Sequence, residues 1–310
     1  MATREEIEET YDFMDEIFRV SFGEHADLTC AMYNGNFSKT LSQAQKDKHD
    51  YILDGIRFKP GFRVLDIGCG FGPVLKAVKE RGGHGIGLTL SRKQAEICKR
   101  AGLEVYVKDW KEVTVDTFGM FDGIVSVGAF EHFCSPEEYL AGKQDAIYNH
   151  FFRLCHDLLA EDGRLYLQTM MFGRNTPEYQ SISLQAEKGS NEYIAAITKE
   201  FFPGSWLPFG EEHILRVAAP YFEQISHNNG RLDYLQTIEE WSKVWNFTFS
   251  NFKDPRARFS RLFIVAKLVP RFFTDRQFRL RTEFLRKGYD KECFRREIID
   301  HQRMVFQKKN

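Results

Sequence analysis

Three glycines at alternating positions, Gly68, Gly70 and Gly72, follow an apolar run that includes Asp66. Pro73 comes next and opens a helical pattern, which suits proline because the first turn of a helix does not need its missing N–H group. The order is therefore strand, glycine turn, helix. Glycine has no Cβ and tolerates positive φ, so this turn lets a ligand approach the backbone closely. A turn that only reverses the chain is the alternative, and alternating glycines behind a buried strand argue against it.

The glycine spacing excludes two common nucleotide-binding loops. A dinucleotide loop places its third glycine three positions after the second, whereas Gly72 follows Gly70 by two. A phosphate-binding loop would continue with Lys and Ser or Thr, and this chain does not. The next predicted strand ends at Thr89 and is followed by Ser91 and Gln94, which offer hydrogen bonds but no carboxylate. Ser91 also suits the cap of the following helix.

A carboxylate, Glu131, follows the predicted strand 121–127 within the string Val-Gly-Ala-Phe-Glu-His-Phe, residues 127–133. A charged side chain is rarely buried at such a position without a use, because desolvation is costly. Ligands of parallel sheets bind at the carboxyl ends of the strands. We therefore expect Glu131 to face the same hollow as the glycine turn.

Hydrophobic periodicity predicts the elements that position these residues. The first part of the chain reads as helix 4–22, an irregular segment 23–38, helix 40–56, strand 62–67, helix 73–81, strand 84–89, helix 91–101, strand 104–108 and strand 121–127. A helical stretch, 136–160, breaks near Gly142, and Asp162-Gly163 makes a turn before strand 164–170. An aromatic-rich insertion (172–215), strand 221–226, helical residues 231–300 and a strand at 304–306 complete the chain.

Strands alternating with helices predict an α/β fold, a doubly wound, mostly parallel seven-stranded sheet of Rossmann-like type with N-terminal helices and an inserted helical cap. No linker or repeat divides residues 1–310, so we expect a single domain. Its parts are a helical lid (1–58), a cofactor-binding core (59–171), and a cap or substrate region (172–220 and 231–300).

Composition limits the partners and the location. The 310 residues carry a net charge of −1 and contain no apolar run long enough for a membrane span. The N-terminus is acidic and lacks a signal region, and the six cysteines form no C-x-x-C pair, which indicates free thiols in the cytoplasm. The nine histidines lack metal-ligand spacing, so no metal is expected.

The C-terminal residues 251–310 are basic, with 17 Lys and Arg against 7 Asp and Glu. A basic segment binds nucleic acid, an anionic membrane or an acidic carrier protein, or is simply a solvated helix face. The sequence contains no nucleic-acid-binding module, so we exclude that partner. Peripheral membrane contact and a carrier protein stay open.

The D-x-G-x-G-x-G string resembles motif I of class I methyltransferases that use S-adenosylmethionine (SAM). Six further strings resemble the cyclopropane fatty acid and mycolic acid methyltransferases within that class. They are Gly87 to Gln94 (G-L-T-L-S-x-x-Q), Thr29 to Tyr33, Leu41 to Lys46, Val127 to Phe133, Phe202 to Pro208, and Tyr234 to Trp241. The resemblance runs from about residue 10 to residue 250.

The resemblance implies a SAM site. In the family the glycine turn wraps the methionine end of SAM, the strand-end Asp supports the loop, and a Thr in the N-terminal segment closes over the cofactor. Two polar groups lie near the ribose, an aromatic ring flanks adenine, and the residue after the fourth strand completes the site. The corresponding residues here are Thr29, Asp66, Gly68, Gly70, Gly72, Thr89, Gln94, Trp110 and Ala129.

The resemblance also implies an anion site, in which Glu131, Cys30 and Tyr234 hold a bicarbonate ion. The family's fourth ligand is a histidine on the fifth strand, and this chain has Gln168 there. Glutamine donates a hydrogen bond to an anion but cannot take up a proton. Cyclopropane closure requires such a base, so the alternatives of a methylene branch or an alcohol stay open.

The expected function is a SAM-dependent C-methyltransferase that adds a methyl or methylene group to the double bond of a long, lipid-like acyl chain. The acyl chain would be carried by an acyl carrier protein or a membrane phospholipid. The alternative is an N- or C-methyltransferase of a specialised small molecule, in which Glu131 and His132 steer or deprotonate an amine. A SAM-binding protein with a decayed site is a third hypothesis, and the intact glycine turn argues against it.

Overall fold

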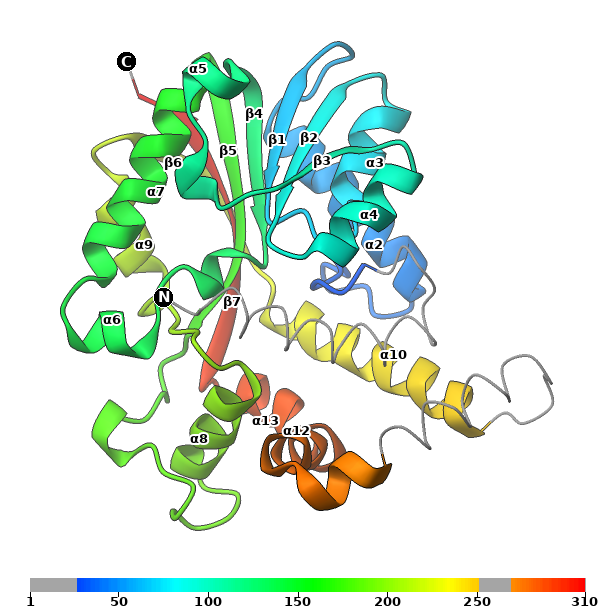
Figure 1. Cartoon of the computed structure of the whole chain (residues 1–310), viewed down its shortest axis with the longest axis vertical. Coiled ribbons are helices and arrows are strands. Elements are labelled where there is room, and N and C mark those ends of the chain that lie inside the picture. Colours follow the sequence, from blue (N-terminus) through cyan, green and yellow to red (C-terminus); the bar gives the residue numbers. More distant parts are fainter. Residues whose placement is uncertain (1–26, 251–268, 310) are drawn as a thin grey trace.

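The computed structural model describes residues 27–250 and 269–309 (Figure 1). The predicted helix 4–22 lies outside these residues, as do residues 251–268 of the predicted cap. The predicted irregular segment is confirmed over residues 27–38, which contain turns and bends but no helix or strand.

A seven-stranded sheet forms the centre of the molecule (Figure 1). Its strands are β1 (Arg63–Ile67), β2 (His84–Thr89), β3 (Glu104–Val107), β4 (Phe121–Val127), β5 (Leu159–Phe172), β6 (Phe222–Asn229) and β7 (Ile299–Lys308). The strand order is β3-β2-β1-β4-β5-β7-β6, and β7 is antiparallel to both of its neighbours. The remaining pairs are parallel. The predicted doubly wound, mostly parallel seven-stranded sheet is confirmed.

The helices of the described residues are α2 (Leu41–Gly55), α3 (Pro73–Glu80), α4 (Arg92–Arg100), α5 (Val115–Phe118), α6 (Pro136–Leu140), α7 (Gln144–Leu158), α8 (Asn191–Phe201), α9 (Gly210–Ala218), α10 (Arg231–Ser250), α12 (Arg276–Lys287) and α13 (Tyr289–Arg295). Helices α2, α3 and α4 match the predicted ranges within a few residues, whereas α5 was not predicted, and β7 begins at Ile299, before the predicted strand 304–306. Short 3₁₀ turns η1 (Trp110–Glu112), η2 (Phe130–His132) and η3 (Tyr179–Ser181) lie in the connections. The predicted break at Gly142 separates α6 from α7, and its φ of 69° explains why glycine is used there.

The predicted turn at Asp162-Gly163 lies inside β5 and not before it: the chain folds back there, since a Cβ added to Gly163 would lie 2.9 Å from the carbonyl oxygen of Ala160. Both residues lie inside β5, whose pairing with β4 shifts between Phe121 opposite Leu159 and Gly123 opposite Arg164. The extra residues form an irregular bulge in a strand that continues through them. The antiparallel neighbour β7 holds this segment, because side chains of Gln307 and Lys308 donate to the carbonyl oxygens of Gly163 and Leu159. A local turn signal could not anticipate that neighbour.

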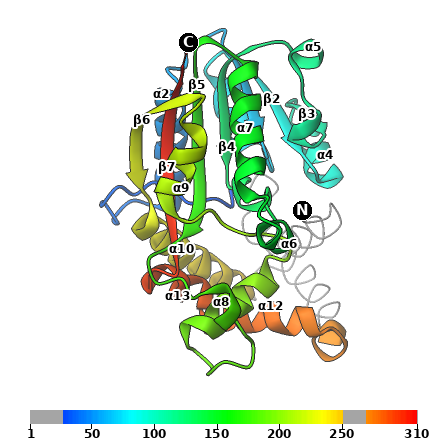
Figure 2. The ribbon, with the colours of Figure 1, turned by 90° about the vertical axis from the view of Figure 1, so that its left-hand side faces the viewer.

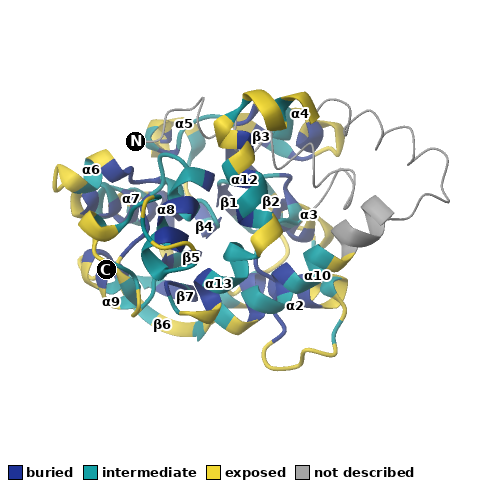
Figure 3. Ribbon diagram, turned by 90° about the horizontal axis from the view of Figure 1, so that it is seen from below, coloured by how far each residue is buried: buried dark blue, intermediate teal, exposed yellow. Residues whose placement is uncertain are grey.

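Helices cover both faces of the sheet. Helices α2 and α3 pack on one face around Val64, Val125 and Tyr166. Helices α7 and α9 pack on the other face, where a cluster of buried rings includes Phe130 and Phe152. Figure 3 shows the buried residues running through the centre of the sheet between exposed helix surfaces. Burial of apolar surface at roughly 25 cal/mol per Å² is the main source of stability of these two layers.

A third group of helices lies beyond the carboxyl ends of the parallel strands. Helices α8, α10, α12 and α13 gather at this end of the sheet (Figures 1 and 2), and two apolar clusters hold them together. They come from the segments for which we predicted a cap, although the division into lid, core and cap stays a prediction. Within the described ranges, no helix combines the length and apolar character needed to cross a membrane.

Replacing Phe152 by Ala should lower the free energy of unfolding by about 3–5 kcal/mol, because the ring is fully buried and the cavity left behind cannot close completely. Urea denaturation measures the change. Phe273→Ala is the control: this ring is 76% exposed, and its loss should cost less than about 0.5 kcal/mol. Equal losses in the two variants would contradict the assignment of Phe152 to the core.

Candidate active site

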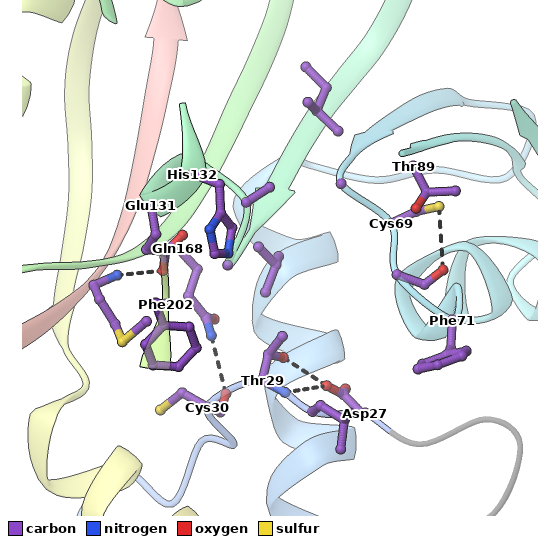
Figure 4. A pocket seen from close by; sticks show the side chains of 18 of the residues that line it. Asp27, Thr29, Cys30, Cys69, Phe71, Thr89, Glu131, His132, Gln168 and Phe202 are labelled. Carbon is purple, nitrogen blue, oxygen red and sulfur yellow. Dashed lines mark hydrogen bonds between the residues drawn. The ribbon is translucent and has the colours of Figure 1, made fainter. Parts of the chain in front are cut away.

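A cavity opens at the carboxyl ends of β1, β2, β4 and β5, under the helices at that end of the sheet (Figure 4). All the predicted site residues except Gly72 line it. They are Thr29, Cys30, Asp66, Gly68, Gly70, Thr89, Gln94, Trp110, Ala129, Glu131, Gln168 and Tyr234. In Figure 4 the glycine turn and Thr89 form one side, and Glu131, Gln168 and Cys30 form the other.

The glycine turn is a cradle with room for a ligand. Gly68 has a φ of +85°, and a Cβ added to it would meet the Cβ of Ala129 at 2.3 Å. The backbone N–H groups of Gly68 and Cys69 donate to the carbonyl oxygen of Leu88, at 3.0 and 2.8 Å, which ties the turn to β2. A Cβ added to Gly70 would meet nothing within 4 Å, so the backbone there is open. These features fit the methionine end of SAM.

Gly72 has a different role from its two neighbours. Its φ is +75°, and an added Cβ would lie 2.7 Å from Leu103 and 3.2 Å from the Sγ of Cys98. The residue therefore packs inward, where it allows the chain to enter α3. The alternation in sequence did not reveal this difference.

The end of β2 supplies polar groups without a carboxylate, as the sequence indicates. The hydroxyl of Thr89 donates to the side-chain carbonyl of Gln94 at 2.7 Å, which leaves the Gln94 amide NH₂ as a donor for a ligand. Ser91 caps α4 by accepting from the backbone N–H of Gln94 at 3.3 Å. Trp110 lines the cavity and also packs against the rings of Phe133 and Phe151, so it belongs to both the site and the core.

A buried polar network holds the N-terminal segment against α2. The Lys48 ammonium group donates to the Asp27 carboxylate at 2.5 Å and to the Thr29 hydroxyl at 2.6 Å. His49 also contacts Asp27, at 2.8 Å. Burial alone would raise the pKa of Asp27, but Lys48 and His49 outweigh it and hold this pKa well below its ordinary value. The hydroxyl of Thr29 is therefore occupied within the protein.

The sequence analysis missed Asp27 and Lys48. A signal for Lys48 was available: it follows the string Leu41 to Lys46 on the same predicted helix, and Gln45 of that string donates to the Thr29 carbonyl at 3.0 Å. Asp27 stands in an irregular segment where no periodicity marks it. Contact with a helix more than 20 residues away is what gives it a role.

The two carboxylate oxygens of Glu131 have different surroundings. It lies in η2, is 2% exposed, and accepts from the backbone N–H of Met170 through Oε1 at 2.7 Å (Figure 4). Its Oε2 is buried and has no hydrogen-bond partner among the described residues. Burial raises the pKa of Glu131 to about 7. An unsatisfied buried carboxylate oxygen is costly and calls for a ligand.

Gln168 and Cys30 are linked to each other. The Gln168 amide donates to the Cys30 carbonyl at 3.2 Å and accepts from the Tyr166 hydroxyl at 3.2 Å. Burial raises the pKa of the Cys30 thiol to about 12, so the thiol stays protonated, and Arg303 donates to its sulfur at 3.3 Å. Gln168 thus fixes the N-terminal segment to β5 and keeps one N–H group for a ligand.

Tyr234 reaches the cavity from α10. Its ring packs 4.7 Å from the ring of Phe294 and 5.2 Å from the ring of His301 (centroid distances). His301 also lines the cavity and is 1% exposed, and the sequence analysis missed it. Within the described part of the chain, no group of His, Cys, Asp and Glu side chains has the arrangement of a metal site.

A comparison with known protein families identifies the family of this chain. The family model for mycolic acid cyclopropane synthetase matches residues 1–259. The chain belongs to that family. Its members include the relatives described below, and the resemblance inferred from the motifs is confirmed.

Two curated relatives and one crystal structure illustrate the similarity. Cyclopropane mycolic acid synthase 2 of Mycobacterium bovis is 34% identical over 247 residues, which cover 77% of this chain and 79% of the relative. Hydroxymycolate synthase MmaA4 of Mycobacterium tuberculosis is 30% identical over 258 residues, covering 81% and 79%. The structure of mycolic acid cyclopropane synthase CmaA1 complexed with SAH and CTAB is 25% identical, with a TM-score of 0.74 over 98% of both chains.

Membership makes this chain a SAM-dependent methyltransferase, and its own residues fit the cofactor. The open backbone at Gly70, the contact between Gly68 and Ala129, and the amide of Gln94 lie in one part of the cavity. The glycine side of the cavity therefore has the room and the polar groups that a methyl donor needs.

Gly68→Ala should weaken binding of the product S-adenosylhomocysteine at least tenfold, measured by calorimetry, because the new methyl group overlaps Ala129 and strains the turn. Gly82→Ala is a matched control, since Gly82 has a φ of +78° but the nearest atom to its added Cβ is 3.6 Å away. Unchanged affinity of Gly68→Ala for S-adenosylhomocysteine would show that this turn is not part of the cofactor site.

Glu131→Gln should change the pH dependence of stability. The folded pKa of about 7 lies above the ordinary value of 4.5, so the contribution of Glu131 to stability is fully present below pH 4.5 and is lost as the pH rises through 7. Relative to wild type, the variant should gain up to about 3 kcal/mol between pH 5 and pH 8 in urea denaturation. Glu223→Gln, at an exposed position, serves as the control, and a gain that does not depend on pH would contradict the assignment.

Proposed function

We propose that this methyltransferase adds a methyl group from SAM to a carbon–carbon double bond in a long acyl chain, giving a cyclopropane or a methyl branch. The observation that carries the proposal is the continuity of the cavity. It joins the glycine cradle to apolar residues of the helices beyond the sheet, and the buried carboxylate of Glu131 lines the same space.

The apolar part of the cavity suits an acyl chain. Phe201 of α8, Ile238 of α10, Phe284 and Leu285 of α12, and Phe294 of α13 all line it. Each buried CH₂ group of a ligand contributes roughly 0.8 kcal/mol. The same walls exclude water, which would otherwise capture a cationic intermediate.

The residues at the junction suit a positively charged intermediate. Bound SAM supplies a methyl group on a sulfonium, so the alkene carbon that is not methylated becomes cationic. The Glu131 carboxylate offers an unpaired oxygen in a buried setting, where its attraction to a cation is strong. The rings of Phe133 and Tyr234 line the same cavity, and an aromatic face adds about 1–2 kcal/mol to a desolvated cation.

A bicarbonate ion fits these residues only in part. The Cys30 thiol, the remaining N–H of Gln168 and Tyr234 line the cavity near Glu131. Arg303 lies directly behind Cys30 and adds positive charge. However, two hydrogen-bonding groups of the Gln168 side chain are already used within the protein. We propose that the anion binds weakly, and we assign it no step of the reaction.

The carrier of the acyl chain is also a proposal. Phe272 and Phe273 are 43% and 76% exposed, and Arg276 and Arg279 follow them on α12. Exposed rings beside cationic side chains suit the surface of an anionic membrane, and an acidic carrier protein would use the same charges. All six cysteines are free and buried, which favours a reducing compartment such as the cytoplasm.

The test is methyl transfer from SAM carrying a labelled methyl group. Purified protein is incubated with phosphatidylglycerol vesicles that contain cis-monounsaturated chains, with an unsaturated acyl thioester of a carrier protein, or with soluble amines. Label in the acyl fraction, with a mass gain of one CH₂, is expected from one of the first two. Label only in the amines would establish the small-molecule alternative instead.

Glu131→Gln should lower this turnover at least a hundredfold while S-adenosylhomocysteine binding changes less than threefold, because the variant loses the charge but keeps the shape. Glu223→Gln again provides the control. Unchanged turnover in Glu131→Gln would remove this carboxylate from the reaction.

A further inference from the structure

We propose that His301 of β7 is a further catalytic residue, the group that takes the proton from the methylated acyl chain. The inference rests on the proposed function, since it assigns the last step of that reaction. It starts from a buried side chain that lines the active-site cavity and has no role in the methyl transfer proposed for the site.

The sheet register places His301 beside Gln168. On the antiparallel pair of β5 and β7, Gln168 is opposite Arg303, and Met170 is opposite His301. Residues two apart on a strand share a face, so His301 is the diagonal neighbour of Gln168 on the face that carries Arg303. It lies two positions closer to the carboxyl end of β5, where the cavity is.

The imidazole of His301 has unused hydrogen-bonding capacity. The residue is 1% exposed, and its Nδ1 is buried without a partner among the described residues. Most buried polar atoms are hydrogen-bonded, and a purely structural histidine would be as well. Glu131 Oε2 is unpartnered in the same cavity. A Cβ added to Gly230, which does not line the cavity, would lie 2.4 Å from Nδ1 of His301, so Nδ1 faces the start of α10 and the rest of the ring lines the cavity.

The other groups of the anion site are unsuited to accept a proton. Glutamine has no basic lone pair at neutral pH, so Gln168 is excluded. The thiol of Cys30 keeps its own proton, because burial raises its pKa to about 12. Burial, Arg303 and Lys48 together lower the pKa of His301, so its ring is neutral and carries a free lone pair at pH 7. Glu131 is left to stabilise the cation.

Further titratable groups line the cavity: Asp27, Asp66, Asp109, His132 and Asp290. Asp27 is paired with Lys48, Asp109 caps η1, and His132 Nδ1 contacts the Ser205 hydroxyl at 2.6 Å. Asp66 lies at the end of β1, beside the glycine turn. Asp290 lies in the first turn of α13. Its carboxylate accepts from the backbone N–H of Lys291 at 2.9 Å, so it has a partner within the helix. His301 instead faces the ring of Tyr234, which is 5.2 Å away between centroids. The imidazole is thus next to a ring that lines the cavity where the cation forms.

The step balances without a further reactant. The π electrons of the alkene form the new bond to the methyl carbon, and the other alkene carbon becomes positive. A C–H bond of the new methyl group then breaks, and its electron pair closes the three-membered ring onto the positive carbon. The proton passes to the lone pair of the neutral imidazole. The positive charge moves from the acyl chain to His301 and leaves with the proton to solvent.

The activity test uses the labelled vesicle assay. His301→Gln should lower kcat at least a hundredfold, in keeping with the usual contribution of an acid–base group, while S-adenosylhomocysteine binding stays within threefold. His227→Gln is the control, since this histidine is exposed on β6. The double variant Gln168→His/His301→Gln moves the imidazole to the adjacent position and should recover at least tenfold over His301→Gln. A kcat of His301→Gln within threefold of wild type, or no recovery in the double variant, would overturn the proposal.

A second readout does not depend on turnover. Wild-type protein labelled with ¹³C at histidine Cε1 is titrated with cetyltrimethylammonium bromide in the presence of S-adenosylhomocysteine. The detergent has a long alkyl chain and a permanent cation, so its head group should displace the His301 signal, which is assigned by its loss in His301→Gln. An unmoved His301 signal at saturating detergent would refute the assignment. If wild type methylates only amines, the proposed function fails, and this signal still decides whether His301 faces the ligand.

Discussion

A fully buried guanidinium ties the walls of the active site together. Arg303 of β7 donates to Asn228 at 2.6 Å, to Asp233 at 3.0 Å, to the Ala31 carbonyl at 2.7 Å and to the Cys30 sulfur at 3.3 Å. Burying a charged side chain away from solvent costs several kcal/mol of free energy unless hydrogen-bonding and ionic partners compensate it. Because these partners come from β6, α10 and the N-terminal segment, the guanidinium fixes three distant parts of the chain against one strand.

The Lys48–Asp27 pair fixes the N-terminal segment in a similar way from the other side. Lys48 is fully buried on α2, and its contacts with Asp27 and Thr29 leave the segment little freedom. Both buried cations hold the wall from behind and do not themselves line the cavity. The wall can therefore be apolar on its inner side while its backbone is held by charge-assisted hydrogen bonds.

Glu131 stands out against that arrangement. The two buried cations have carboxylate partners, whereas Glu131 has no cationic partner among the described residues, and its Oε2 is unpartnered. A carboxylate with so little compensation has a raised pKa and attracts positive charge strongly. Under the proposed function, this burial falls at the place where methyl transfer would create a cation.

Local patterns were enough to predict most of the fold. Strand and helix periods are set by residues close in sequence, so the boundaries of β1, α3 and β2 came out within about two residues. The turn predicted at Asp162-Gly163 lies inside β5, because the Gln307 side chain of β7, more than 130 residues away, donates to the Gly163 carbonyl and holds the segment beside the sheet. The alternation of glycines suggested three equal contacts, but packing against Leu103 turned Gly72 inward.

The sequence by itself determined the fold class, the family, the glycine cradle and the identity of the carboxylate at 131, because each depends on short strings of residues. Tertiary structure alone decided that Gln168 anchors Cys30, that Lys48 and Arg303 brace the wall, and that His301 reaches the cavity. The physical reason is that hydrogen-bond satisfaction and burial depend on which distant elements meet. Strand register and helix packing decide which distant elements come into contact, and local sequence patterns do not predict those contacts.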